Sequence, residues 1–353
     1  MTSAGPGLPG GMRPRWSRRG QASVLALVLT VLTVLQGCQA DPGYGGRTSA
    51  EWAAQLRDAP AREREQAARA LGTVLSLNPR LSAPTTALIA ALSDTVDAVR
   101  VAAAQALAQP GVRVKAATAA ALGAMLADSA HAAVRMQAVR ALGMLATNAV
   151  DSLARREMER AILRLHRDPD ASVRAAVAAT LTEARTKTSA PGTRQEIDAV
   201  LEMLARDTMQ APRAAALVGL ALAMTPRAVP AVRQAARDAS PVIRALAAGA
   251  LGRVTNDAAM SDAAMASLLE LVTDSATAVR LAAVQALGTR TASHPPAVDA
   301  ALRVASRDTN ALVQREARHA LSRFHARGGK DPVGPEPTHA ERCAQLPPRT
   351  RGC

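Results

Sequence analysis

Aromatic side chains are almost absent from the sequence. Among 353 residues they are limited to Trp16, Tyr44, Trp52 and Phe324. A single large core uses bulky rings to fill its volume, so we expect many thin contacts between Ala- and Leu-rich helices instead. The shortage also disfavours a nucleic-acid groove, because single strands bind by stacking their bases on aromatic rings. The abundant helix formers Ala, Leu, Arg, Gln and Glu predict an all-α protein.

Sequence signatures of catalysis and metal binding are missing as well. The chain has no H-E-x-x-H helix, no G-x-S-x-G nucleophile turn and no glycine-rich phosphate loop. None of its histidines forms a His-Glu pair, and His319 and His325 are six residues apart, which places them on different faces of a helix. The other histidines are His131, His166, His294 and His339. We therefore predict no catalytic residue, no metal and no cofactor.

Lysine is scarce, and arginine dominates a formal net charge of +14. Such a balance permits anionic partners, but it indicates non-specific association rather than a site. One cluster near the C-terminal end comprises Arg315, Arg318, Arg323, Arg327 and Lys330. It has two interpretations, a solvated polar cap on the last helix or a weak contact with anionic lipid.

The N-terminal region has the features of an export signal. Four arginines precede an apolar run at 24–35, and the first acidic residue is Asp41. A run of this length is too short for a membrane-spanning helix, so residues 1–37 are predicted to be a signal peptide. The arginines are Arg13, Arg15, Arg18 and Arg19.

Residues 35–38, Leu-Gln-Gly-Cys, resemble the lipobox of bacterial lipoproteins, although Gln36 departs from the usual small or β-branched residue. The resemblance implies lipidation of Cys38 and a membrane-anchored protein on the periplasmic face. Gln39 stands where an inner-membrane retention signal has Asp, which favours the outer membrane. The alternative is an uncleaved signal anchor with an incidental Cys. Residues 38–49, rich in Gly and Pro, are predicted to be a flexible linker.

An internal repeat dominates the rest of the chain. The segment "DPDASVRAAVAATL", which starts at Asp168, returns in altered form at intervals of 31 to 39 residues, eight times in all. A catalytic pair would not be copied in this way, whereas a structural joint would. The acidic positions are Asp58, Asp94, Asp128, Asp168, Asp207, Asp238, Asp274 and Asp308. The matching basic positions are Arg64, Arg100, Arg135, Arg174, Arg213, Arg244, Arg280 and Arg315.

Every unit has the same order of features. An amphipathic segment such as "TTALIAALSD" precedes the Asp, and Pro, Ser or Thr often follows it. These are helix N-cap and first-turn residues, so each Asp is predicted to lie in a turn between two helices. Two helices per unit, stacked side by side, predict an α-solenoid.

The units resemble HEAT repeats, in particular the short type also found in phycobilisome lyases. The resemblance covers residues 50–326 and implies a right-handed α-solenoid of about eight two-helix repeats. It also implies that the turn Asp and the second-helix Arg form a hydrogen-bonded ladder between neighbouring repeats. Three units depart from the pattern: one residue is inserted before Arg135, the fifth unit has Pro212 at its helix start, and Gln314 stands where the eighth Arg is expected.

Two classes of function follow from the resemblance. The first is a scaffold in the cell envelope that binds another protein or peptide through the inner surface of the solenoid. The second is an enzyme or cofactor-handling protein similar to bilin lyases or HEAT-repeat oxidoreductases, for which no catalytic motif is present. The segment 327–353 is rich in Pro, Gly and charge and is predicted to be disordered. Its Cys343 and Cys353 either close a disulfide loop or remain as two thiols.

Overall fold

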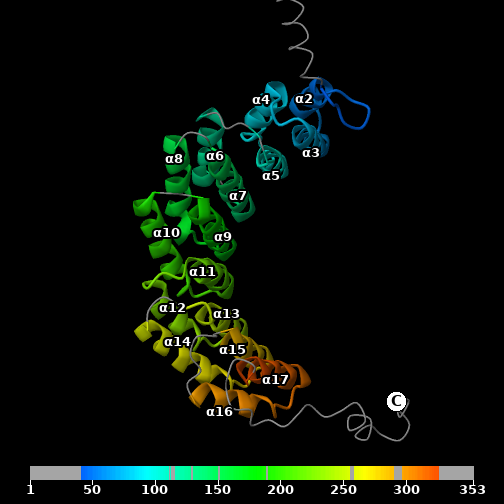
Figure 1. Ribbon diagram of the computed structural model, residues 1–353. Helices are drawn as coiled ribbons and strands as arrows, with labels where there is room; N and C mark the ends of the chain where they lie inside the picture. Colours follow the sequence, from blue (N-terminus) through cyan, green and yellow to red (C-terminus); the bar gives the residue numbers. More distant parts are fainter. Residues whose placement is uncertain are drawn as a thin grey trace, which may run out of the picture.

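The protein is an all-α solenoid. A computed structural model describes residues 41–325, apart from 111, 113–115, 129, 150–151, 188–189, 255–257 and 290–295. The predicted signal peptide, Cys38, Arg327 and the tail with Cys343 and Cys353 lie outside the described residues. Within them the chain forms sixteen α-helices and one 3-10 turn, and a lone β-bridge joins Tyr44 to Arg47. The predicted fold class is confirmed (Figure 1).

The helices alternate between two layers of a curved stack (Figure 1). We call the layer on the convex side the outer helices and the layer on the concave side the inner helices. The outer helices are α2 (Ser49–Asp58), α4 (Ser82–Ala91), α6 (Ala116–Asp128), α8 (Ser152–Leu163), α10 (Pro191–Leu204), α12 (Ala228–Ala235), α14 (Ala258–Leu271) and α16 (Pro296–Ala305). The inner helices are α3 (Ala61–Leu77), α5 (Asp97–Leu107), α7 (Ala132–Asn148), α9 (Ala171–Lys187), α11 (Gln210–Ala223), α13 (Pro241–Leu251), α15 (Thr277–Thr289) and α17 (Ala311–His325).

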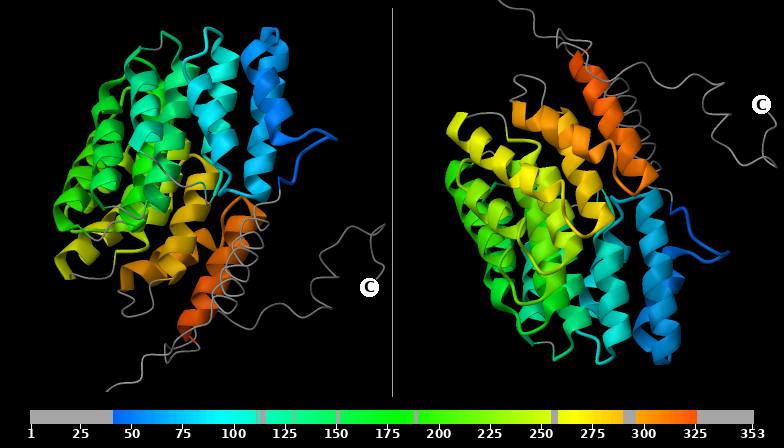
Figure 2. Two further views of the ribbon diagram at one scale, coloured as in Figure 1. Left: turned by 90° about the horizontal axis from the view of Figure 1, so that it is seen from above. Right: turned by 90° about the horizontal axis from the view of Figure 1, so that it is seen from below.

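The curvature follows from unequal packing in the two layers. Neighbouring inner helices contact each other along much of their length, whereas neighbouring outer helices touch only locally. Small residues permit the close approach: a Cβ added to Gly72 of α3 would lie 3.0 Å from the Cβ of Ala106 in α5. On Gly143 of α7 it would lie 2.1 Å from Cγ2 of Thr180 in α9, a clash. The two views of Figure 2 show neighbouring helices side by side, with a direction that turns gradually from the blue N-terminal helices to the orange C-terminal ones.

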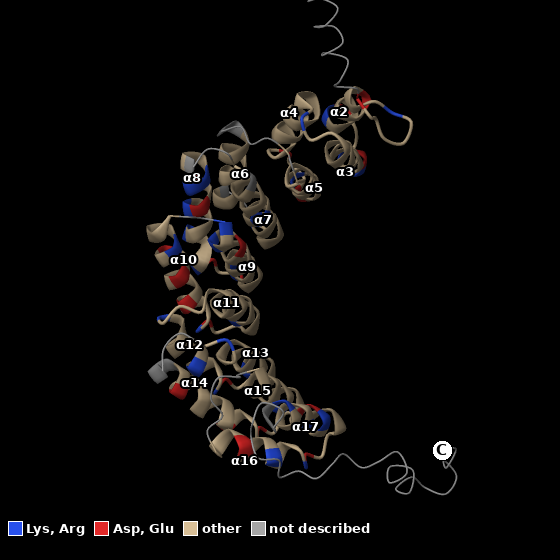
Figure 3. Ribbon diagram, viewed as in Figure 1, with Lys and Arg blue, Asp and Glu red and all other residues tan. Residues whose placement is uncertain are grey.

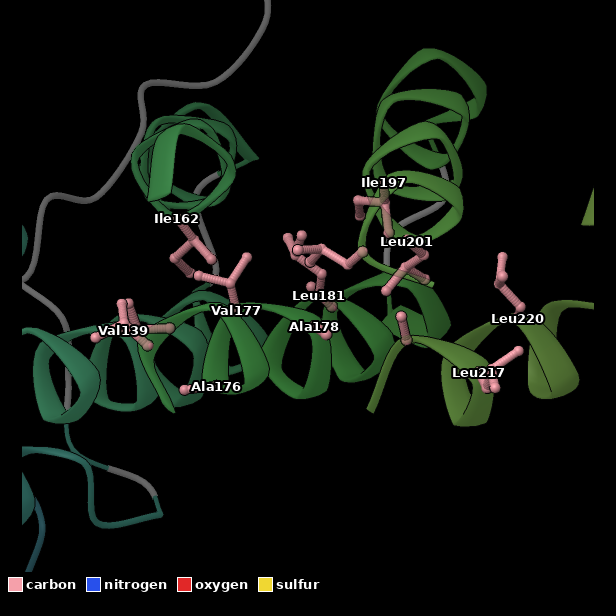
Figure 4. Packing of buried hydrophobic residues seen from close by; sticks show 14 of the residues in the cluster. Val139, Ile162, Ala176, Val177, Ala178, Leu181, Ile197, Leu201, Leu217 and Leu220 are labelled. Carbon is pink, nitrogen blue, oxygen red and sulfur yellow. The ribbon is translucent and has the colours of Figure 1, made fainter. Parts of the chain in front are cut away.

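The core is a continuous layer of aliphatic side chains between the two helix layers. Ile162 of α8 lies over Val177 of α9, and Leu181 of α9 faces Leu201 of α10 (Figure 4). Leu217 of α11 continues the row into the next unit. These side chains are at most 1% exposed, so each outer helix is held by apolar contact with the inner helices beneath it.

The described chain before α2 falls within the predicted linker at 38–49. From residue 41 onward it forms an ordered turn, in which Nε1 of Trp52 donates a hydrogen bond to the Tyr44 carbonyl at 2.9 Å. The guanidinium of Arg47 lies over the Trp52 ring, 4.9 Å from its centroid. Thr48 and Glu51 form a capping box at the start of α2. The turn therefore covers Trp52, which no preceding repeat among the described residues could bury.

Among the described helices, none combines the length and apolar content that a membrane-crossing helix requires. The apolar run at 24–35 precedes the described residues, so its role stays a prediction.

Candidate protein-binding surface

A ladder of ion pairs joins successive repeats at the turns that lead into the inner helices. In each rung an Arg from the first turn of one inner helix reaches the carboxylate of the turn Asp in the next repeat. Arg174, for example, donates from Nε and Nη2 to the two carboxylate oxygens of Asp207, at 2.6 and 2.8 Å. The other described rungs, with Nε–Oδ2 distances between 2.6 and 2.8 Å, are Arg64–Asp94, Arg135–Asp168, Arg213–Asp238, Arg244–Asp274 and Arg280–Asp308.

Each member of the ladder also fixes its own turn. Nη1 of Arg174 donates to the backbone carbonyl of Asp168, the turn residue of its own repeat, at 2.7 Å. Oδ1 of Asp207 accepts the backbone N–H of Met209 at 2.9 Å, which shapes the turn before α11. One guanidinium therefore ties its own turn to the next one, and the planar fork of Arg suits this better than Lys would.

The pKa values of four ladder carboxylates are lowered by their arginine partners. The hydrogen bonds from Arg174 lower the pKa of Asp207 below its ordinary value, against the opposing effect of burial. The pKa values of Asp94, Asp274 and Asp308 are lowered for the same reason, by Arg64, Arg244 and Arg280.

Three of the predicted ladder residues, Arg315, Arg100 and Asp58, have no described rung of this kind. Arg315 is exposed, and Gln314 takes the Arg position instead by donating Nε2 to the Asp308 carbonyl at 2.5 Å. Asp308 itself is engaged by Arg280 of the preceding repeat. Arg100 contacts Asp97 of its own helix, while the side chain of Asp128 lies outside the described residues. Asp58 is exposed in the first described repeat, where no described unit precedes it.

The exposed side of the inner helices, which we call the inner face, follows a constant register. The positions are counted from the ladder Arg of each inner helix. In every inner helix from α5 to α15, the residue two positions before this Arg and the residue five positions after it are exposed. The residue nine after is also exposed from α9 to α15. These three positions are separated by seven and four residues, spacings that return to one side of a helix, so they form a single stripe. From α9 to α15 the stripe reads Ser172, Ala179, Glu183, Ala211, Val218, Leu222, Val242, Gly249, Arg253, Ala278, Gln285 and Thr289.

The middle of the inner face is apolar. Val218 and Leu222 of α11 are 45% and 56% exposed, and Val242 of α13 is 52% exposed. On α11, α13 and α15 the only charged residue is the ladder Arg, which pairs with the Asp of the next turn, whereas Arg253 of the stripe is an exposed cation just beyond the end of α13. These helices are accordingly drawn mostly tan in Figure 3. We call Val218, Leu222 and Val242 the apolar inner patch, and an exposed cluster of this kind is typical of an interaction site.

A groove borders the apolar inner patch. It has a volume of about 410 Å³ and lies between α13 and α15, lined by Gly249, Gly252, Ala282, Gln285 and Thr289 among others. Gly249 has open space where a Cβ would stand, so the absence of a side chain leaves the groove accessible. The exposed Arg253 also lines the groove, so the patch and the groove present small and apolar side chains over three consecutive inner helices together with one cation.

The ends of the inner face are charged. Arg140 of α7 and Glu183 of α9 are exposed on one side of the apolar inner patch. On the other side, counted from Gln314, the stripe positions of α17 are Leu312, His319 and Arg323, all exposed, and Arg323 pairs weakly with Glu316 at 3.5 Å. Arg315 and Arg318 of α17 are also exposed but lie outside the stripe. The predicted lipid-binding cluster is therefore a solvent-facing surface of the last described helix, as far as Arg323.

The described histidines are dispersed rather than gathered. His131 contacts Asp97, Nδ1 of His166 lies 2.7 Å from the Leu163 carbonyl, and His319 is exposed on α17. Within the described ranges, no group of three His, Cys, Asp or Glu side chains is placed to hold a metal ion.

Two buried acidic residues escaped the sequence analysis. Asp198 of α10 forms an ion pair with Arg185 of α9, with a second contact from Nη2 at 3.1 Å. Glu159 of α8 is 1% exposed, and its Oε2 lacks a hydrogen-bond partner among the described residues. Burial raises the pKa of Glu159, while Arg155 and Arg156 act in the opposite direction. Both residues lie outside the repeated Asp–Arg register, so the repeat gave no sign of them.

Comparisons with known proteins agree with this architecture. The family model of HEAT repeats matches residues 197–288, which include α11 and α13, the helices of the apolar inner patch. This part of the chain therefore consists of HEAT repeats. The comparison with curated proteins gives no match.

Several solved structures have a similar fold. An engineered protein is 21% identical, with 78% of each chain covered and a TM-score of 0.52. YibA of Escherichia coli is 13% identical over 89% of this chain and 99% of its own, with a TM-score of 0.56. A chain from the structure of Kap95p bound to RanGDP is 15% identical over 78% of this chain and 39% of its own, with a TM-score of 0.57. At these identities the likeness shows the fold alone.

Proposed function

We propose that the protein is a cell-envelope lipoprotein that acts as a scaffold and binds another protein or peptide through its inner face. The observation that carries this proposal is the apolar inner patch. Leu222, the most exposed of its three residues, is 56% accessible on an inner helix whose only charge is already paired. Apolar surface left open in this position is stabilised when a partner covers it.

The shape of the solenoid suits an extended partner. The stripe of exposed positions crosses successive inner helices, so a bound segment would contact several repeats at once. Affinity would then come from many modest contacts rather than from one deep pocket. The complex of Kap95p with RanGDP contains a chain of similar fold and is an instance of such a protein with a protein partner.

The binding part of the proposal is tested by photo-crosslinking in native membranes. A photoreactive phenylalanine analogue replaces Leu222 on the inner face in one variant and Val304 in another, where Val304 is 61% exposed on the outer helix α16. We expect a discrete crosslinked product from position 222, repeated at position 218, and none from 304. Equal products from 222 and 304 would contradict binding through the inner face.

The predicted signal-peptide cleavage and lipidation are tested separately by measuring the intact mass of the protein from native membranes. A chain that begins at Cys38 and carries lipid would support the lipoprotein assignment. An unprocessed chain would leave the signal anchor as the explanation of the apolar run at 24–35.

A further inference from the structure

A second surface, distinct from the inner face, lies at the turns of the fifth and sixth repeats. A groove of about 660 Å³ runs there from the turn before α11, along α12, to Ser267 of α14. Four guanidinium groups line it, those of Arg206, Arg213, Arg233 and Arg237. Its only acidic lining residues are Asp207 and Asp238.

The acidic residues of this groove are already neutralised. Asp207 receives two hydrogen bonds from Arg174, and Asp238 forms the ladder ion pair with Arg213 at 2.8 Å. Their charges therefore do not compensate the remaining arginines of the groove.

The remaining arginines contact neutral or weakly held partners. Nε of Arg206 donates to the amide oxygen of Gln234 at 2.9 Å, and Nε of Arg233 donates to Oγ of Ser267 at 3.3 Å. Arg237 pairs with Glu270 at 3.2 Å, but both side chains are more than half exposed, and such a pair contributes little. Arg206 and Arg233 thus leave their positive charge uncompensated in the groove.

The position of two of these arginines is repeated in the sequence. An Arg stands directly before the turn Asp in five units, at Arg57, Arg167, Arg206, Arg237 and Arg307, and all five are exposed. The Asp side chain turns into the ladder, so the preceding residue points outward. A cation after the last turn of an outer helix is favoured by the helix dipole, which explains the placement but supplies no counter-ion. Arg233 lies in the last turn of α12, where the helix dipole favours a cation in the same way.

We propose that this groove binds an acidic peptide segment of a partner protein. Guanidinium forks match carboxylates in a bidentate geometry, and the groove offers several of them within one continuous surface. Between them lie Ala205, Pro230 and Ala235, which give an apolar floor for the methylene groups of Asp and Glu side chains. The mixture of apolar floor and basic wall fits a peptide better than a bare phosphate group.

The proposal is tested with the full-length protein and a fluorescein-labelled peptide of alternating Glu and Ala, measured by anisotropy at 150 mM salt. Because the protein carries a formal net charge of +14, any loss of positive charge could weaken the binding of an acidic peptide. The test therefore needs a control variant with the same change in net charge as the groove variant. Arg206→Glu with Arg233→Glu alters the groove, whereas Arg57→Glu with Arg80→Glu removes the same charge from exposed positions in the first repeats. Equal melting temperatures verify that both variants are folded.

We expect the groove variant to weaken peptide binding at least tenfold and the control variant to change it less than twofold. Equal weakening by both variants would overturn the proposal, because only net charge would matter. Vesicles of phosphatidylcholine with and without phosphatidylglycerol form the second arm. Loss of vesicle binding in the groove variant with unchanged peptide binding would also overturn it and assign the arginines to lipid phosphate.

Discussion

Arg174 and Asp207 are 33 residues apart in the sequence, yet two hydrogen bonds of 2.6 and 2.8 Å join their side chains. The guanidinium also holds the Asp168 carbonyl, so a single side chain fixes the spacing of two turns. In the described structure, the repeated Asp and Arg therefore join neighbouring repeats through their side chains.

Replacing Arg174 with Ala is expected to destabilise the protein by about 2–4 kcal/mol, because Asp207 would remain buried without its partner. The side chains are only 13% and 9% exposed, so solvent does not replace the lost contacts. Thermal and urea unfolding midpoints measure the change, with Arg57→Ala at an exposed position as the control. Partner affinity should change less than stability, and an unchanged midpoint would argue against a structural role for this rung.

Acidification is expected to unfold the protein through the same carboxylates. In the folded state the pKa values of Asp94, Asp207, Asp274 and Asp308 are lowered. The unfolded chain has ordinary pKa values of about 3.9 and therefore binds more protons as the pH falls below about 4. Stability from these groups is complete above that range and is lost as the pH falls toward the lowered values. Melting temperatures between pH 7 and pH 2 measure it, and Asp207→Asn should show a smaller loss than the wild type.

Glu159→Gln is expected to stabilise the protein at neutral pH by about 1–2 kcal/mol, because it removes a buried charge with an unsatisfied oxygen. The sign is opposite to that of the ladder: burial raises the pKa of Glu159, so its folded state is favoured when the group is protonated. The difference between variant and wild type should shrink as the pH falls from the raised pKa of the folded state to below the ordinary pKa of Glu. A destabilised variant at pH 7 would show that Arg155 and Arg156 outweigh the burial.

Substitutions of two leucines, one buried and one exposed, distinguish an effect on stability from an effect on partner binding. Leu181→Ala removes a fully buried side chain from the core and should cost about 2–5 kcal/mol of unfolding free energy. Leu222→Ala removes an exposed one and should change stability by less than about 0.5 kcal/mol while reducing partner binding. Denaturation and crosslinking yield on both variants measure the two effects. A Leu222→Ala variant that unfolds early would mean that this side chain supports the fold.

The fold could be predicted because each repeat carries the same local signals. The turn Asp, the following helix start and the Ala- and Leu-rich second helix recur in step, so periodicity reveals the helix pairs. The ordered turn at Trp52 could not be predicted, because its hydrogen bond to Tyr44 depends on how the first helix end is covered. Glycine-rich composition alone indicated a flexible segment there.

The candidate surfaces were harder to predict. Val218 and Leu217 are adjacent aliphatic residues of one helix, yet one is 45% exposed and the other 1%. Only the position of α11 between its neighbours decides which side faces the concave surface. Similarly, the arginines at 206 and 233 belong to different elements, and the groove that joins them depends on how α12 packs against the turn before α11.

The unequal packing of the two helix layers has a mechanical consequence. Close contacts such as Gly72 against Ala106 leave the inner layer almost no room to shorten, while the outer helices touch only locally. When the solenoid bends, the separation between neighbouring outer helices therefore changes more than the separation between neighbouring inner helices. The spacing of Val218, Leu222 and Val242 stays nearly constant during such motion, so the molecule can change its curvature without changing the surface it presents.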